Sequence, residues 1–323
     1  RPLLAEPDYL NKLRAGRRDE IRPCISCHEG CMGRIQEYSM INCAVNPQAA
    51  RERVTAYEPI LKAKKVMIVG GGVAGCEAAR VLALRGHKPA LFEKGAQLGG
   101  NLLPGGAPEF KEDDIALAKW YAVQLQKLNV PVQLNHEVTA KEALDGGYDT
   151  VIVATGSTPK IFSLGDDAHT FTAAEVLLGQ KDCGERTVVI GGGLVGCETA
   201  LWLAQHGRKV TIVEALDKIL AVNGPLCHAN KDMLEELIPY NGIEVVTGAK
   251  ATGYHDVLSV ECADGGKDIV CDSVILSVGY KEEDSLYHEL EFKVPEIYLL
   301  GDAKKVSNIM YAIWDAFEVA NHI

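Results

Sequence analysis

The sequence lacks features that would place the protein in a membrane or on a nucleic acid. Its 323 residues contain no run of 18 consecutive apolar residues, which is about the length that a membrane-spanning helix needs. Acidic residues outnumber basic ones, and the formal net charge is 33 − 44 = −11. A nucleic acid or an anionic membrane would require a basic face. We therefore expect neither kind of partner.

The start of the chain also lacks a signal peptide. Arg1-Pro2-Leu3-Leu4 has no resemblance to one, and it is not a natural start either. We therefore expect this chain to be a piece of a longer protein. Its length suits two to three domains, and its composition, 47% hydrophobic and 24% charged, is that of an ordinary globular protein.

The ten cysteines are not spaced as in a disulfide scaffold. Four of them lie close together with the spacing C-x2-C-x3-C-x11-C: Cys24, Cys27, Cys31 and Cys43. Such a cluster without a secretion signal predicts metal binding in a reducing compartment, here the cytoplasm. Four thiolates suit either tetrahedral zinc or a 4Fe–4S cluster. Three cysteines close together and one remote favour the 4Fe–4S cluster, and zinc remains the alternative.

An internal repeat recurs at a constant offset of 121 residues. Residues 66–93 read VMIVGGGVAGCEAARVLALRGHKPALFE, and residues 187–214 read TVVIGGGLVGCETALWLAQHGRKVTIVE. They share 12 of 28 positions without a gap. Each copy is a β-branched run, a glycine loop, a helical stretch, a glycine and a second strand that ends in Glu. This order predicts the first βαβ unit of a dinucleotide-binding fold, twice.

Each glycine of the motif has a separate expected role. Gly70 and Gly191 permit the tight turn, Gly72 and Gly193 let the backbone approach a pyrophosphate, and the third glycine lets the helix pack closely. A carboxylate at the end of the second strand can accept hydrogen bonds from ribose hydroxyls. The residues expected to bind dinucleotides are Gly70, Gly71, Gly72, Gly75, Glu93 and Lys94 in the first copy, and Gly191, Gly193, Gly196 and Glu214 in the second.

Three further buried strands are expected at residues 148–156, 273–279 and 297–302. Ligands gather at the carboxyl ends of the strands in open α/β sheets. The residues at these ends that we expect to contact cofactors are Ala154, Thr155, Gly156, Gly279, Gly301 and Asp302. Helix capping is the alternative role for Asp302.

This arrangement resembles the two-dinucleotide flavoprotein superfamily that includes glutathione and thioredoxin reductases, over about residues 64–323. The resemblance implies FAD in the first nucleotide fold, NAD(P)H in a second fold inserted into it, and Gly301-Asp302 on the FAD ribityl and phosphate. The helix from about Met310 would point at the flavin. The nucleotide domains lack the C-x2-C or C-x4-C pair of disulfide reductases, and we expect Cys76 and Cys197 to fill the core.

The wider segment RPCISCHEGCMGR…INCAVNP resembles the cluster segment of the old-yellow-enzyme-like iron–sulfur flavoproteins. These include 2,4-dienoyl-CoA reductase, 2-enoate reductase, the bile-acid enoate reductases, and trimethylamine and histamine dehydrogenases. The resemblance implies that an FMN-binding TIM barrel precedes this chain, and that residues 1–23 resemble its end. It also implies that the small-molecule substrate binds in the absent barrel, so that no catalytic residue is assigned here.

The expected fold class is α/β, with two Rossmann-like domains of the glutathione-reductase type preceded by a small iron–sulfur segment. The expected boundaries are a barrel exit and 4Fe–4S segment at 1–50, an FAD domain at 51–160 and 283–323, and an inserted NAD domain at 161–282. The cofactors are FAD, NAD(H) and a 4Fe–4S cluster, with FMN in the absent barrel.

The expected function is electron transfer from NADH through FAD to the cluster, and in the longer protein on to FMN and an α,β-unsaturated substrate. Hydride transfer requires the nicotinamide in near-attack geometry. Because Glu214 would oppose a 2′-phosphate, NADH is expected over NADPH. Two alternatives remain. One is an amine-dehydrogenase-like module with outward electron flow and structural ADP, and the other is a non-catalytic nucleotide-binding module with zinc.

Overall fold

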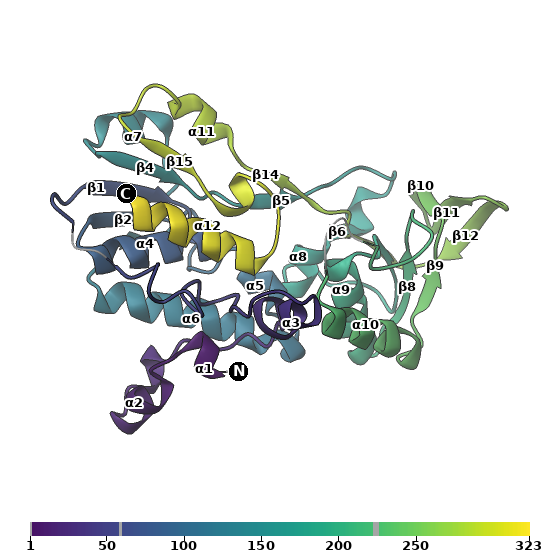
Figure 1. Cartoon of the computed structure of the whole chain (residues 1–323). Coiled ribbons are helices and arrows are strands. Elements are labelled where there is room, and N and C mark those ends of the chain that lie inside the picture. Colours follow the sequence, from purple (N-terminus) through teal and green to yellow (C-terminus); the bar gives the residue numbers. More distant parts are fainter. Residues whose placement is uncertain (1, 58–59, 222–225) are drawn as a thin grey trace. The chain divides into compact units, whose positions relative to one another are not determined.

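The computed structural model describes residues 2–57, 60–221 and 226–323 (Figure 1). The chain divides into two compact units, and the second is inserted into the first. The first unit contains the described residues of Arg1–Gly106, Lys111–Thr158 and Glu282–Ile323. The second contains those of Ala107–Phe110 and Pro159–Lys281. The α/β fold class predicted from the sequence is confirmed.

The first unit is built on a five-stranded parallel sheet with the order β15-β4-β1-β2-β3. The chain enters at the central strand, runs to one edge through β2 and β3, and then returns to the other side. The connections from β1 and from β4 lead to strands on opposite sides of the sheet, so the strand order reverses between β1 and β4. Sheets of this kind bind ligands at such a switch point. The strands are β1 (Lys65–Val69), β2 (Lys88–Phe92), β3 (Val132–Gln133), β4 (Thr150–Val153) and β15 (Ile297–Leu299).

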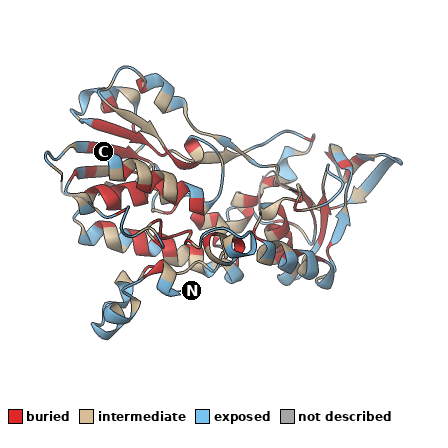
Figure 2. Cartoon of the chain, viewed as in Figure 1, coloured by how far each residue is buried: buried red, intermediate tan, exposed pale blue. Residues whose placement is uncertain are grey.

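Alternate side chains of these strands belong to two hydrophobic clusters. Val66 and Ile68 pack into the cluster that includes α4 (Val73–Arg85), α6 (Glu112–Lys127) and α12 (Ile309–His322). Met67 and Val69 pack into the other, with side chains of α7 (Ala140–Asp145) and α11 (Ser285–Leu290). Because both faces are covered, most residues of these strands are apolar, as is typical of parallel sheets. The buried strands and helix faces are red in Figure 2.

The second unit repeats this plan. Its five-stranded parallel sheet has the order β6-β13-β7-β8-β9, so β7 takes the place that β1 has in the first unit. The elements of this sheet and its helices are β6 (Thr170–Thr172), α8 (Ala173–Leu177), β7 (Arg186–Ile190), α9 (Leu194–Gln205), β8 (Lys209–Val213), α10 (His228–Tyr240), β9 (Glu244–Val246) and β13 (Ser273–Leu276). An antiparallel sheet follows β9, made of β10 (Ala249–His255), β11 (Val257–Cys262) and β12 (Gly265–Val270).

The remaining elements are short. A two-stranded sheet pairs β14 (Tyr280–Glu282) with β5 (Ser157–Pro159). The first 36 residues contain α1 (Pro2–Ala5), α2 (Tyr9–Arg14), the 3-10 turn η1 (Arg18–Glu20), the π-turn η2 (Glu29–Gly33) and α3 (Arg34–Gln36). The others are α5 (Leu102–Gly105) and the 3-10 turns η3 (Glu109–Lys111), η4 (Asp167–His169) and η5 (Gly301–Ala303).

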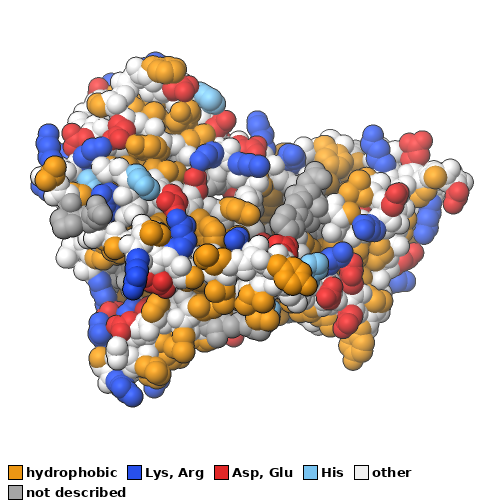
Figure 3. Space-filling model, in the orientation of Figure 1, with side chains coloured by type: hydrophobic (Ala, Val, Ile, Leu, Met, Phe, Trp, Pro, Cys, Tyr) orange, Lys and Arg blue, Asp and Glu red, His pale blue; other side chains and the backbone are white. Residues whose placement is uncertain are grey.

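On the face drawn in Figure 3, acidic and basic side chains are interspersed. Within residues 2–57, 60–221 and 226–323, the helices are all too short or too polar to cross a bilayer.

Candidate functional site

The first glycine loop connects β1 to α4, and two of its glycines are required by the protein itself. Gly70 has φ of +111°, and a Cβ there would lie 2.2 Å from the carbonyl oxygen of Ala154. A Cβ on Gly75 would lie 1.9 Å from the carbonyl oxygen of Gly70. At Gly72, in contrast, a Cβ would meet no heavy atom within 4 Å. The space beside Gly72 is therefore left open by the protein, as close approach of a ligand would require.

The second loop, between β7 and α9, has the same geometry. Gly191 has φ of +105°, and a Cβ there would lie 2.2 Å from the carbonyl oxygen of Ser277. A Cβ on Gly196 would lie 1.9 Å from the carbonyl oxygen of Gly191. Helix α4 begins after Gly72 and α9 after Gly193, and neither helix start has a side-chain cap. Uncapped N–H groups at a helix start favour an anion such as a pyrophosphate.

The acidic residues that end β2 and β8 are held against their own glycine loops. Glu93 accepts hydrogen bonds from the N–H of Gly71 and of Gly95, both at 2.6 Å. Glu214 accepts from Gly192 at 2.6 Å and from Leu216 at 2.8 Å. An ionised carboxylate has about four acceptor positions, so two remain for ribose hydroxyls. The sequence indicated the ribose contact and missed the second function, which is to fix the loop.

A cysteine also contacts each loop. Cys76 and Cys197 are buried, as expected of core residues. Their thiols donate hydrogen bonds to the carbonyls of Gly71, at 3.3 Å, and Gly192, at 3.4 Å. The same two carbonyls also accept from the N–H of Gly99, at 2.9 Å, and of Leu220, at 2.7 Å, so each thiol is one of two donors to its loop. The cysteines therefore help to orient the loops.

Three segments predicted to bind a cofactor follow β1, β4 and β15, which are neighbouring parallel strands. These segments, residues 70–72, 154–156 and 301–302, therefore lie at the same edge of the first sheet. Asp302 Oδ2 accepts a hydrogen bond from Ser157 Oγ at 3.0 Å, and Oδ1 accepts from the N–H of Ser307 at 3.1 Å. Burial raises the pKa of the Asp302 carboxyl. Helix α12 is capped by Asn308, whose Oδ1 accepts from the N–H of Tyr311 at 3.0 Å. Asp302 is therefore not the cap of this helix.

The segment 154–156 follows β4 directly, and its counterpart in the second unit follows β13. Thr155 Oγ1 donates to the carbonyl of Glu283. Gly156 has φ of +77° and Gly279 has φ of +93°, so both segments turn through the left-handed region at the equivalent place. Gly301 has φ of +59° and lies at the end of β15. Lys94 is exposed next to Glu93.

The four clustered cysteines face one hollow in the first unit. Cys24, Cys27, Cys31 and Cys43 line one small hollow, together with apolar residues such as Leu4, Ile25 and Val45. None of the four forms a disulfide, and all four are half-buried. Burial raises the pKa of the Cys27 thiol to about 12 and raises that of Cys43. Since thiols in apolar surroundings resist ionisation, a positively charged metal centre would be needed to hold them as thiolates.

The cysteines share this hollow without converging on one point. Among the described residues, no three His, Cys, Asp or Glu side chains form a group that could hold a single metal ion. A zinc ion bound at about 2.3 Å would require its four thiolates to meet closely. A cubane cluster spreads its thiolates over four irons.

The hollow is held by contacts between distant segments of the first unit. The N–H of Asn42 donates to the carbonyl of Gly30 at 2.7 Å, and a Cβ on Gly30 would lie 2.9 Å from Ala44 N. Trp314 of α12 donates from Nε1 to the carbonyl of Cys43 at 3.0 Å. The loop that contains the cysteines therefore depends on the last helix for support.

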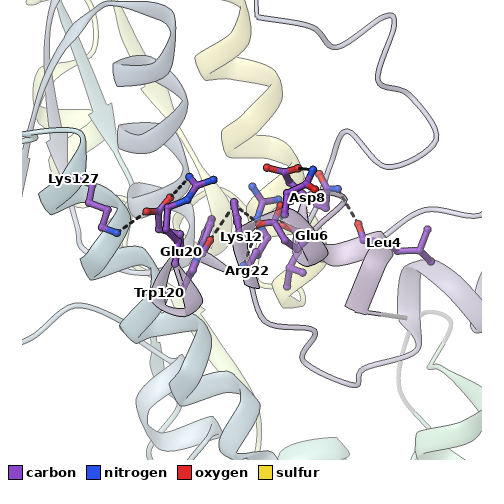
Figure 4. Close-up of polar contacts among 12 residues, drawn as sticks. Leu4, Glu6, Asp8, Lys12, Glu20, Arg22, Trp120 and Lys127 are labelled. Atoms are coloured by element: carbon purple, nitrogen blue, oxygen red, sulfur yellow. Dashed lines mark hydrogen bonds and ion pairs between the residues drawn. The ribbon is translucent and has the colours of Figure 1, made fainter. Parts of the chain in front are cut away.

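The segment before the cysteines is fastened to α6 (Figure 4). Trp120 donates from Nε1 to the carbonyl of Glu20 at 2.9 Å, and Lys127 Nζ lies 2.8 Å from the carboxylate of Glu20. Nearer the N-terminus, Lys12 Nζ and Glu6 Oε2 are 2.6 Å apart. These contacts fix the approach of the chain to Cys24.

Comparison with known proteins identifies relatives of this chain and a solved structure with the same fold. The chain is 49% identical to cinnamate reductase of Clostridium sporogenes over all of this chain and 49% of the relative. It is 38% identical to NADH oxidase of Thermoanaerobacter brockii over 99% of this chain and 50% of the relative. The solved structure of a 2-naphthoyl-CoA reductase complex superposes with a TM-score of 0.94 and 28% identity, over 100% of this chain and 50% of that chain.

The chain thus spans about half the length of the relatives that it matches. These relatives are reductases and an oxidase, which confirms the resemblance to the old-yellow-enzyme-like iron–sulfur flavoproteins. The model of one family, described as pyridine nucleotide-disulphide oxidoreductase, matches residues 64–316. This range contains both glycine loops, both acidic strand ends and Asp302. The chain belongs to the pyridine nucleotide-disulphide oxidoreductase family.

Proposed function

We propose that this chain carries electrons from NADH through FAD to a 4Fe–4S cluster. In the longer protein, the electrons would pass on to FMN and reduce an α,β-unsaturated substrate. The observation that carries the proposal is the position of the four thiols. They line one hollow in the same unit as the first glycine loop, and α12 contacts the loop that contains them.

The assignment of the nucleotides follows from the two units. The first loop lies at the same sheet edge as Gly301 and Asp302, so we assign FAD to the first unit. The second unit has an equivalent loop, but the acid that follows its edge strand β6, Glu175, belongs to the capping box of α8, and we assign NAD(H) to this unit. When bound, these groups supply hydride transfer, and the cluster supplies one-electron transfer.

The residues of the chain have distinct parts in this scheme. The N–H groups at the starts of α4 and α9 would hold the two pyrophosphates. Glu93 and Glu214 would each accept ribose hydroxyls while they fix the loops. Asp302 would accept a hydrogen bond from the FAD ribityl chain. Cys24, Cys27, Cys31 and Cys43 would ligate the cluster as thiolates.

Exposed apolar side chains support the proposal that a barrel domain covers the cysteine segment. Between Cys31 and Cys43 the exposed apolar residues are Met32, Ile35, Tyr38 and Met40, and Tyr38 is 100% exposed. A group of exposed apolar side chains is typical of an interaction surface. The partner that we propose is the FMN-binding TIM barrel, which would also select the small-molecule substrate. The relatives' names favour an enoate or a similar activated alkene.

Cofactor analysis of the purified protein, followed by addition of NADH, tests this function. We expect protein purified without oxygen to contain FAD, iron and acid-labile sulfide, and to be reduced by NADH with loss of the flavin absorbance. ADP in place of FAD would instead support electron output from an amine dehydrogenase. A colourless protein that contains zinc would show that the chain is a nucleotide-binding module without redox activity.

A further inference from the structure

Arg22 occupies an unusual position beside the four cysteines. It lies two residues before Cys24, and it is only 8% exposed. Its Nη1 donates a hydrogen bond to the carbonyl of Val45 at 2.7 Å, two residues after Cys43. The guanidinium therefore links the beginning of the cysteine segment to its end.

Neighbouring residues fix the guanidinium in place (Figure 4). Its central carbon lies 4.8 Å from the centre of the Trp120 ring, which is within the range of a cation–π contact. The Trp120 ring is held in turn by its bond to the carbonyl of Glu20. The backbone N–H of Arg22 donates to Glu6 Oε2 at 3.2 Å. The positive charge is thus held between Trp120 and the end of the cysteine segment.

The other buried charges of the first unit have partners of opposite sign. Arg80 Nη2 lies 2.7 Å from Glu77 Oε1, Glu6 pairs with Lys12, and Asp114 lies 3.8 Å from Lys111 Nζ. Arg22 differs from these. Within the described parts of the chain, no carboxylate lies within 4.0 Å of its guanidinium, and its buried Nε has no hydrogen-bond partner.

An unpaired buried cation is costly, because it loses its hydration and gains no counter-charge. The four thiols of the cysteine segment, whose two ends the guanidinium links, can supply that charge when they are ionised. Four thiolates carry more negative charge than a cubane core carries positive charge, so the ligated cluster is an anion. Each electron that it accepts makes it more negative, and a nearby fixed cation favours that change.

We propose that Arg22 is the counter-charge of the cluster and raises its reduction potential. This inference rests on the proposed function, because it requires a 4Fe–4S cluster on Cys24, Cys27, Cys31 and Cys43. Arg22 acts through the cluster by its charge. It favours the state that has accepted one electron, and it therefore favours electron transfer from the flavin into the cluster.

The test is a redox titration of the cluster, followed by electron paramagnetic resonance, in the wild type and in Arg22→Gln. The substitution removes the charge and retains a shorter polar side chain. We expect the reduced-to-oxidised ratio at a fixed potential to fall on the order of tenfold, which is about 59 mV for a one-electron couple. Arg22→Lys retains the charge and should recover most of the wild-type potential.

Lys127→Gln is the matched control. It also removes a positive charge from the same region, but the charge of Lys127 is exposed and paired with the carboxylates of Asp19 and Glu20. Its cluster should keep the wild-type potential. If the control shifts as far as Arg22→Gln, loosening of the segment explains the effect and the proposal is wrong.

The remaining outcomes separate this inference from the proposed function. An intact cluster with an unchanged potential in Arg22→Gln would overturn the role of Arg22 and leave the function standing. If Arg22→Gln loses its iron, the titration of Arg22→Lys is the test. A wild-type reduction potential in Arg22→Lys supports the role of the positive charge. A tenfold lower reduced-to-oxidised ratio in Arg22→Lys contradicts it. Absence of iron and sulfide from the wild type would overturn both proposals.

Discussion

The carboxylate of Glu214 accepts a hydrogen bond from the N–H of Gly192, with 2.6 Å between Gly192 N and Glu214 Oε2. This bond places a negative charge directly beside the second glycine loop. A 2′-phosphate at the same position would add about two negative charges, and no cation among residues 215–217 would compensate for them. We therefore predict that the second unit uses NADH in preference to NADPH.

The measurement is kcat/KM for both cofactors with an artificial acceptor, in the wild type and in Glu214→Ala. The unfavourable contact should cost on the order of 1–3 kcal/mol, or roughly 5- to 150-fold in selectivity. The variant should lose most of that selectivity and should also bind NADH more weakly, because its loop is no longer fixed. Equal use of NADPH by the wild type would refute the preference, and an unchanged ratio in the variant would refute the mechanism.

Substitution of Gly72 by Val should remove FAD from the purified protein. Gly72 has an extended backbone that any residue adopts, and a Cβ there meets no protein atom within 4 Å. The fold should therefore tolerate Val, while the branched side chain occupies the space of the pyrophosphate. The flavin content is read from the visible spectrum. Gly193→Val is the matched variant in the second unit, and it should weaken NADH binding but retain FAD. The reverse result would exchange the two assignments.

Replacement of any of Cys24, Cys27, Cys31 or Cys43 by Ser should abolish the iron–sulfur absorbance. Serine supplies a hard, weakly acidic oxygen in place of a soft thiolate. Iron and sulfide analysis of anaerobic protein gives the result directly. Cys271→Ser is the control, since Cys271 is buried in the second unit and should not affect iron content. Full iron and sulfide in Cys43→Ser would contradict the ligand set.

Substitution of Cys76 should weaken the binding of FAD, and substitution of Cys197 should weaken the binding of NADH. Cys76→Ala removes the thiol that contacts Gly71, so FAD affinity should fall by about 3- to 10-fold, as expected for the loss of one hydrogen bond. Cys76→Ser retains a donor and should lie closer to the wild type. Cys197→Ala should instead raise the KM for NADH with little change in FAD content. Equal affinities in all the Ala and Ser variants would show that the two thiols only fill space.

This chain alone should oxidise NADH with an artificial acceptor and should reduce no enoate. Its two nucleotide loops suffice for the first activity, while the proposed barrel is needed for the second. Steady-state rates with cinnamate and with a dye as acceptors decide the matter. Enoate reduction by this chain would mean that the substrate binds among the described residues.

The sequence predicts the fold well because the fold depends on local patterns. The apolar strand of 66–69, the glycine loop and the acid 23 residues later recur in both copies, and each is short-range information. The roles of Gly70 and Gly75 in the turn agree with the φ of +111° and the close carbonyl. Cofactor contacts at these residues stay predictions.

The contacts that support the sites were not predictable in this way. The spacing of Glu93 predicts a contact with a ribose, but it does not predict the bond to Gly71, which depends on the turn geometry. Arg22 and Trp314 gave no signal, since a buried Arg and a helical Trp have many uses. Only the folded chain brings Arg22 to Val45 and Trp314 to Cys43.

The bond between Trp314 and Cys43 joins residues that are 271 positions apart. During translation, the four cysteines leave the ribosome long before the helix that supports them has been made. A cluster delivered at that stage would meet a loop that is still unsupported. Cluster insertion should therefore follow completion of the nucleotide-binding fold, and truncation before α12 should yield protein that cannot retain iron even when the cysteines are all present.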